Sequence, residues 1–133
     1  MRIRTIQTTL AAAFAALALT ACQTPQAIYN VDNGAVTPSM AKSVSAAQVR
    51  QAIITGGTSL GWKVTDAGPG RLEATLHLRS HTAVVDIPYS SSTYSIKHKR
   101  TEGLNESDGM IHRNYNSWVQ NLDRAIRTEI SRL

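Results

Sequence analysis

Apolar and polar residues alternate along the middle of the chain, from residue 62 to residue 100. The runs 72–79, 83–89 and 94–99 each place an apolar side chain at every second position, and a shorter run at 62–65 does the same. A period of two is that of a β-strand, whose successive side chains point to opposite faces of a sheet. The pattern therefore predicts four strands in an antiparallel meander, with one apolar and one polar face.

Turn residues and charges favour one register for this meander. Turns are expected at 67–70, 80–81 and 90–93, where glycine, proline and serine cluster. The register matches apolar residues with apolar residues and opposite charges with each other. The pairs that it predicts include Leu78 with Ala83, Asp86 with Lys97, and Lys63 with Glu73.

A helix is expected before the strands. Ser45 and Gln48 have the spacing of a capping box, in which both side chains satisfy backbone N–H groups at a helix start. The helix is predicted from about 46 to 54, or as far as residue 60, and glycines near its end favour a frayed or bent C-terminus. Its buried side is predicted to be Val49, Ala52, Ile53 and Leu60.

A second, longer helix is expected at the end of the chain. After a polar loop at 101–110, apolar residues recur at steps of three and four, and Ser107 or Asp108 is expected to cap the helix. The stripe expected to cover the sheet is Ile111, Tyr115, Trp118, Val119, Leu122, Ile126, Ile130 and Leu133. The side expected to face water is Arg113, Asn116, Gln120, Asn121, Arg124, Arg127 and Ser131.

Together these elements predict an α+β fold of two layers in the order αββββα. A four-stranded antiparallel meander is covered on one face by the long C-terminal helix and a shorter N-terminal helix. This single domain spans 45–133, and residues 22–44, with two prolines and an Asn-Gly pair, are predicted to form a flexible tether. Ile28, Tyr29 and Val31 leave open a short strand or docked segment within that tether.

The N-terminal segment 1–21 has the pattern of a secretory signal peptide. Arg2 and Arg4 precede the run Leu10–Ala21, which is uncharged and apolar apart from one threonine. An apolar region of roughly 7 to 15 residues is typical of a signal peptide, whereas a helix that crosses a bilayer needs about 20. We therefore expect export of residues 22–133 with this segment as the signal.

The end of that apolar run, Leu19-Thr20-Ala21-Cys22, resembles the lipobox of bacterial lipoproteins. The resemblance implies a diacylglycerol on the Cys22 thiol, cleavage just before it, and an acyl chain such as palmitate on the new amino terminus. Gln23, which is not Asp, implies sorting to the inner leaflet of the outer membrane. The alternatives are a buried or a reactive thiol, which would leave a lone cysteine in an oxidising compartment.

Charge adds little to this interpretation. The formal net charge of +5 falls to +3 without residues 1–21, since 12 basic and 9 acidic side chains remain. The basic residues are scattered, and an exported chain rarely meets nucleic acid. We expect no nucleic-acid partner.

Candidate catalytic and metal-binding residues are sparse. His77, His81, His98 and His112 are predicted on different faces, so no zinc site with three or four ligands is expected. The serines at 90–92 are interpreted as a turn, and the few carboxylates as partners of lysines. The sequence therefore predicts no catalytic residues, no metal and no cofactor beyond the acyl chains on the cysteine.

Two surfaces are candidate binding sites. His77, Arg79, Lys97 and Lys99 on the polar sheet face are a possible contact surface for a partner, with ordinary solvated surface as the alternative. A possible ligand rim for a sugar or peptide is formed by His112, Arg113, Tyr115 and Trp118. The alternative is that both aromatics belong to the core, and their burial decides between the two.

The runs "ATLHLRSHTAVVDIPYSSSTYSI" and "IHRNYNSWVQNLDRAI" resemble a family of small, uncharacterised bacterial lipoproteins. This resemblance implies a lipid anchor and a compact domain, and it brings no catalytic residue. We therefore expect a lipid-anchored periplasmic protein that is not an enzyme and acts as a binding or structural module, with an envelope protein or glycan as its partner. The alternative is a small-molecule or glycan-binding lipoprotein that uses the aromatic rim.

Overall fold

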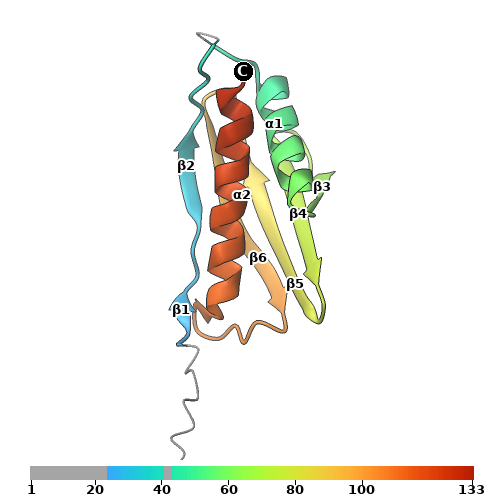
Figure 1. Ribbon diagram of the computed structural model, residues 1–133, viewed down its shortest axis with the longest axis vertical. Coiled ribbons are helices and arrows are strands. Elements are labelled where there is room, and N and C mark those ends of the chain that lie inside the picture. The colour runs from blue at the N-terminus through green and yellow to red at the C-terminus, as the bar shows by residue number, and fades with distance from the viewer. Residues whose placement is uncertain (1–23, 41–42) are drawn as a thin grey trace, which may run out of the picture.

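The computed structural model describes residues 24–40 and 43–133 and forms two layers, with two helices side by side on one face of an antiparallel sheet (Figure 1). The five strands of this sheet lie in the order β2-β6-β5-β4-β3, and β1 pairs with β7 in a separate small sheet. The elements are β1 (Gln26–Ala27), β2 (Val31–Ala35), α1 (Ala46–Ser59), β3 (Lys63–Asp66), β4 (Arg71–Leu78), β5 (His81–Pro88), β6 (Thr93–Glu102), β7 (Met110–Ile111) and α2 (Arg113–Ser131).

The α+β class and the meander of β3 to β6 are confirmed, but the expected four-stranded sheet has a fifth strand. This strand, β2, comes from the segment predicted as a tether and pairs with the free edge of β6. Val31 is buried opposite Ile96. A bulge between Val31 and Gly34 accommodates the polar residues Asp32 and Asn33, so the strand continues past them. Asn33 adopts a φ of 50° within the bulge, and its N–H donates to Ser95 Oγ at 3.0 Å.

The predicted register is correct in one hairpin and shifted by two residues in the other two. Asp86 does pair with Lys97. Leu78, however, pairs with His81 instead of Ala83, and Glu73 pairs with Thr65 instead of lying opposite Lys63. A shift of two residues keeps every side chain on its face, so the apolar match cannot distinguish the two registers.

The capping box of α1 is present. Gln48 N donates to Ser45 Oγ at 3.2 Å, and Ser45 N donates to Gln48 Oε1 at 2.9 Å. The helix does not fray at its glycines, because α2 packs directly against them. A side-chain carbon at Gly56 would lie 2.9 Å from Ile126 N. Leu60, predicted as buried, is 43% exposed just after the helix ends.

Helix α2 begins later than expected and buries one polar residue. Its N-cap is His112, whose Nδ1 accepts from Asn114 N at 3.1 Å, and not Ser107 or Asp108. The apolar stripe packs on the sheet as predicted, with Trp118 and Leu133 only partly buried. Asn116, predicted to face water, is 7% exposed.

The core lies between the helices and the sheet. The largest fully buried side chains come from both layers, which shows that the single expected apolar face is the one covered. They are Tyr94, Tyr115, Ile53, Leu72, Ile87, Ile96, Leu104, Ile111, Leu122, Ile126, Ile130 and Val49.

Candidate functional site

The N-terminal segment of the fold is held by the buried side chain of Asn116. Its Oδ1 accepts from Tyr29 N at 2.9 Å, and its Nδ2 donates to Ala27 O at 2.8 Å and to Gln26 Oε1 at 3.3 Å. An amide is suited to this position because it both donates and accepts. The segment predicted as a flexible tether is thus fastened to α2, just after β1.

On the open sheet face, Lys99 is held by two carboxylates. Its Nζ lies 2.6 Å from Glu73 Oε2 and 3.7 Å from Asp86 Oδ1. Lys99 follows the inward-facing His98, so alternation places it on this face, and a bulge between the β5–β6 pairs Val85–His98 and Val84–Arg100 puts Arg100 on the same side. The hydrogen bond to Glu73, followed by the charge of Asp86, raises the pKa of the Lys99 ammonium.

The predicted partner-contact surface is therefore brought together only in part. Lys97 is exposed and lies opposite Asp86 in the β5–β6 register. His77 is exposed, and its Nδ1 lies 3.0 Å from Thr82 Oγ1. Arg79 lies instead in the β4–β5 turn, with a φ of 55°.

The predicted ligand rim is not formed as one surface. Tyr115 is fully buried, and burial followed by the charge of Glu106 raises the pKa of its phenol. Trp118 is partly buried and lines a separate apolar groove of about 110 Å³ together with Leu60 and Leu78. Drug-sized ligands occupy pockets of roughly 300 to 1,000 Å³, so this groove is too small for one.

The other two rim residues lie at the start of α2. His112 caps the helix, and Arg113, its first residue, is exposed. Neither is among the residues that line the Trp118 groove. The four rim residues thus serve the core, the cap and the surface separately.

A polar cluster joins β6 to the loop that precedes β7. His98 Nε2 lies 3.1 Å from Glu106 Oε2, at an ion-pair distance but without hydrogen-bond geometry. Thr101 Oγ1 donates to the same carboxylate oxygen at 2.6 Å, and the His98 ring packs edge-on against Tyr115 with centroids 5.3 Å apart. These contacts hold the loop against the sheet.

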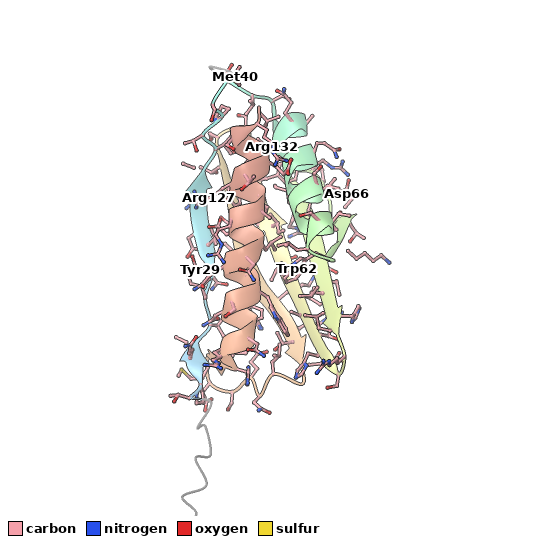
Figure 2. The ribbon with its side chains drawn as sticks, viewed as in Figure 1. Tyr29, Met40, Trp62, Asp66, Arg127 and Arg132 are labelled. Carbon is pink, nitrogen blue, oxygen red and sulfur yellow. The ribbon has the colours of Figure 1, made fainter. Side chains whose placement is uncertain are left out.

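A second polar cluster joins α2 to β6 near β2. Tyr94 Oη donates to Asp123 Oδ1 at 2.5 Å, and Arg127 Nε donates to Asp123 Oδ2 at 2.9 Å. Arg127 lies on α2 (Figure 2). Burial and the bond to Asp123 raise the pKa of the Tyr94 phenol. Each polar group has a partner, and the cluster fixes the helix on the sheet.

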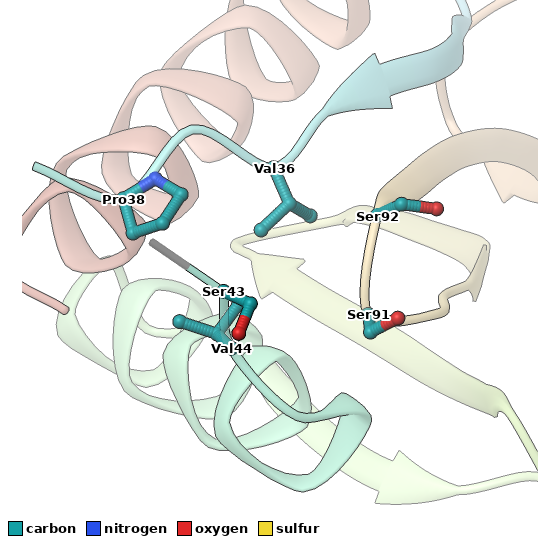
Figure 3. Close-up of a pocket in the computed structure, with 6 residues that line it drawn as sticks. All are labelled: Val36, Pro38, Ser43, Val44, Ser91 and Ser92. Atoms are coloured by element: carbon teal, nitrogen blue, oxygen red, sulfur yellow. The ribbon is translucent and has the colours of Figure 1, made fainter. Parts of the chain in front are cut away.

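Two open hollows lie near the β5–β6 turn. One, of about 260 Å³, is lined by Val36, Pro38, Ser43, Val44, Ser91 and Ser92 (Figure 3). The other, of about 310 Å³, is lined by Asn33, Pro88, Tyr89, Ser90, Thr93, Ser95 and Lys97. Among the described residues of these two linings, Lys97 is the one that carries a charge.

The spacing Gly57-x-Ser59-x-Gly61 is that of a nucleophile elbow, which is not among the candidates named from the sequence. An elbow places its serine on a sharp turn between a strand and the following helix. Here Ser59 is instead the last residue of α1, and its Oγ donates to Gly56 O at 2.7 Å. The spacing thus marks the end of a helix.

The histidines lie in different surroundings. His81 packs edge-on against Trp118 with ring centroids 6.2 Å apart, away from the His98 cluster. Within residues 24–40 and 43–133, no three side chains among His, Cys, Asp and Glu are placed to hold a metal ion. In the same residues, neither α1 nor α2 has an apolar stretch that reaches across a bilayer.

The predicted lipid attachment site, Cys22, and the signal segment 1–21 lie outside the described residues. Comparisons with protein families, curated proteins and solved structures found no match for this chain. The resemblance to small bacterial lipoproteins therefore stays a prediction from the sequence.

Proposed function

We propose that this protein is a bacterial lipoprotein, anchored to the periplasmic side of the outer membrane by acyl chains on Cys22. The observation that carries the proposal is the position of the one cysteine, at the end of an uncharged apolar run and four residues before β1. Several acyl chains, at about 0.8 kcal/mol for each buried methylene, hold a domain on a membrane durably.

The anchor is tested by labelling cells with radioactive palmitate. We expect label on the wild type and none on Cys22→Ala. The double variant Cys22→Ala with Met40→Cys is the matched control, because it restores one thiol at an exposed position without a lipobox. Label retained by Cys22→Ala contradicts the proposal, and label on the double variant would show that attachment does not depend on the motif.

We further propose that the anchored domain is not an enzyme and binds an envelope protein or glycan through its open sheet face. In support, the carboxylates there, Glu73 and Asp86, are engaged by Lys99 and are not available as an acid/base pair. Lys97 and His77 remain exposed on the same face. The ligand-rim alternative has less support, because Tyr115 is enclosed and Trp118 alone of the two aromatics lines a groove.

In-cell crosslinking tests the contact surface. A photocrosslinking residue at Lys97 is compared with one at Arg124, which is exposed on α2 in the opposite layer. We expect one defined adduct from the crosslinker at position 97, identified by mass spectrometry, and a weaker adduct when His77→Glu, on the same face, is added. Equal adducts from both positions, or none from Lys97, contradict the assignment of this face.

A further inference from the structure

The fold begins very close to the proposed lipid. Gln23, Thr24 and Pro25 are the residues between Cys22 and Gln26, where β1 starts. With at most about 3.6 Å per residue, the four steps from Cys22 to Gln26 span no more than about 14 Å. The headgroup layer on each side of a bilayer is itself about 5 to 7 Å thick. The start of β1 is therefore held within about 10 Å of the outer limit of the headgroups.

β1 and three other segments lie at one end of the domain, and we call this the basal end. They are β1, β7, the β4–β5 turn at 79–80 and the segment 103–109, all at the lower end of Figure 1. Ile28 N donates to Gly109 O at 2.9 Å, and β1 pairs with β7. A side-chain carbon at Gly103 would lie 2.7 Å from Ser80 O, so the turn and the segment are in contact.

The domain is too long to turn its other end to the membrane. Helix α2 has 19 residues and runs along the long axis of the domain (Figure 1), which corresponds to roughly 28 Å. Met40, which is 85% exposed, lies at the opposite end (Figure 2). A connection of about 14 Å to β1 therefore does not allow the domain to invert, with the Met40 end on the headgroups and β1 a full domain length away.

We infer that the basal end is the membrane-contacting surface of the protein, lying on the lipid headgroups, and that the domain stands upright with Met40 pointing away. This inference rests on the lipid attachment proposed above. It replaces the expected long tether with a short connection, because Asn116 and β7 hold residues 26–29 in the fold.

The side chains of the basal end indicate that the short connection from Cys22 to β1, and not charge, holds this end on the membrane. Leu78 and Met110 are 43% and 39% exposed there. Positive side chains do not outnumber negative ones, so attraction to anionic lipids is weak. The charged residues in or next to its segments are Arg79, Glu102, Glu106, Asp108 and Arg113.

The test uses the full-length lipidated protein in vesicles. Because Cys22 is the single cysteine and lipidation consumes its thiol, Met110→Cys and Met40→Cys each offer one site for a thiol-reactive fluorophore. Lipids with a nitroxide on the headgroup quench a fluorophore that lies near them. We expect quenching at Met110→Cys to exceed that at Met40→Cys several-fold, equally in zwitterionic and anionic vesicles. Ser107→Cys, exposed in the segment before β7, is a second basal reporter in case the first variant does not fold.

Different results overturn the lipid anchor and the basal contact. A mass spectrum without acyl chains, with fluorophore on Cys22, overturns the lipid anchor itself. A lipidated protein with equal quenching at both ends, or quenching that needs anionic lipid, overturns the basal contact alone. Insertion of ten Gly and Ser residues after Pro25 adds a flexible span of about 17 Å, and we expect it to lower the quenching at Met110→Cys. Unchanged quenching after the insertion overturns the role of the short connection.

Discussion

Replacement of Asn116 by alanine removes the three hydrogen bonds that fasten residues 26–29 to α2. Two of these bonds are short, at 2.8 and 2.9 Å, and a typical neutral hydrogen bond contributes about 1 kcal/mol net. The pairing of β1 with β7 and the bond from Ile28 N to Gly109 O remain in place. We therefore expect the free energy of unfolding to fall by about 2 kcal/mol.

Two measurements follow the effect of Asn116→Ala. For a domain of roughly 100 residues, a loss of about 2 kcal/mol lowers the melting temperature by about 8 to 16 °C. If the segment opens locally instead, hydrogen exchange of the Tyr29 amide accelerates by roughly 30-fold, since 1.4 kcal/mol corresponds to a factor of ten. The matched control is Asn114→Ala, which truncates an exposed asparagine of the same helix and should change stability by less than about 0.5 kcal/mol.

The variant Asn116→Asp sharpens this test. A carboxylate can still accept from Tyr29 N, but its second oxygen would face Ala27 O and Gln26 Oε1, which are both acceptors. The protonated form is favoured in the fold, so the destabilisation should grow as pH rises from 4 to 7. The reasoning is refuted if Asn116→Ala behaves like Asn114→Ala in both stability and exchange.

Three further expectations concern the packing of the two layers. Tyr94→Phe should lower the free energy of unfolding by about 1.5 to 3 kcal/mol, because it removes the bond to the Asp123 carboxylate. Tyr115→Phe should be neutral or stabilising, since Tyr115 Oη is buried with no hydrogen-bond partner among the described residues. Chemical denaturation compares the two variants. In an alkaline titration followed by tyrosinate absorbance, both phenols should stay protonated well above pH 10, and stability should fall as pH rises above about 10 because only the unfolded chain then releases these protons. Gly56→Ala should lower the melting temperature, since its methyl group would meet the backbone of Ile126 and the overpacking cost of about 1 to 3 kcal/mol outweighs a helix-propensity gain of about 1 kcal/mol. Gly57→Ala, whose methyl group would meet a Val64 methyl group, should destabilise the domain less. A rise in melting temperature for Gly56→Ala contradicts the close approach of the helices.

The hydrophobic pattern predicted which side chains face the core but not how the strands pair. Leu72, Ala74 and Leu76 are buried as their alternation requires. A slip of two residues keeps that alternation, so the pattern accepted a turn at 80–81 although Leu78 pairs directly with His81. Asp86 and Lys97 were placed correctly because the four-residue turn before β6 was identified from its serines.

The sequence left open a short strand or docked segment at Ile28, Tyr29 and Val31, and β2 with the docked Tyr29 matches it, but the extent of the strands was not predicted, for a local reason. Asp32, Asn33 and Gly34 are turn residues in most contexts, and here they form a bulge that only the edge of β6 explains. Asn116 was assigned to water because amides usually are. Its true role depends on backbone groups of Ala27 and Tyr29, almost ninety residues earlier in the sequence, with which no short-range pattern connects it.

The same long-range contacts determine when the N-terminal strands can fold. Asn33 and its partner Ser95 are 62 residues apart, and Ala27 and Asn116 are 89 apart. Contacts of such sequence separation form late, because closing the loop between them costs entropy before any contact is gained. β1 and β2 therefore stay unpaired until β6, β7 and the start of α2 are available to them. The N-terminal edge of the fold, which lies next to the proposed anchor, thus closes last.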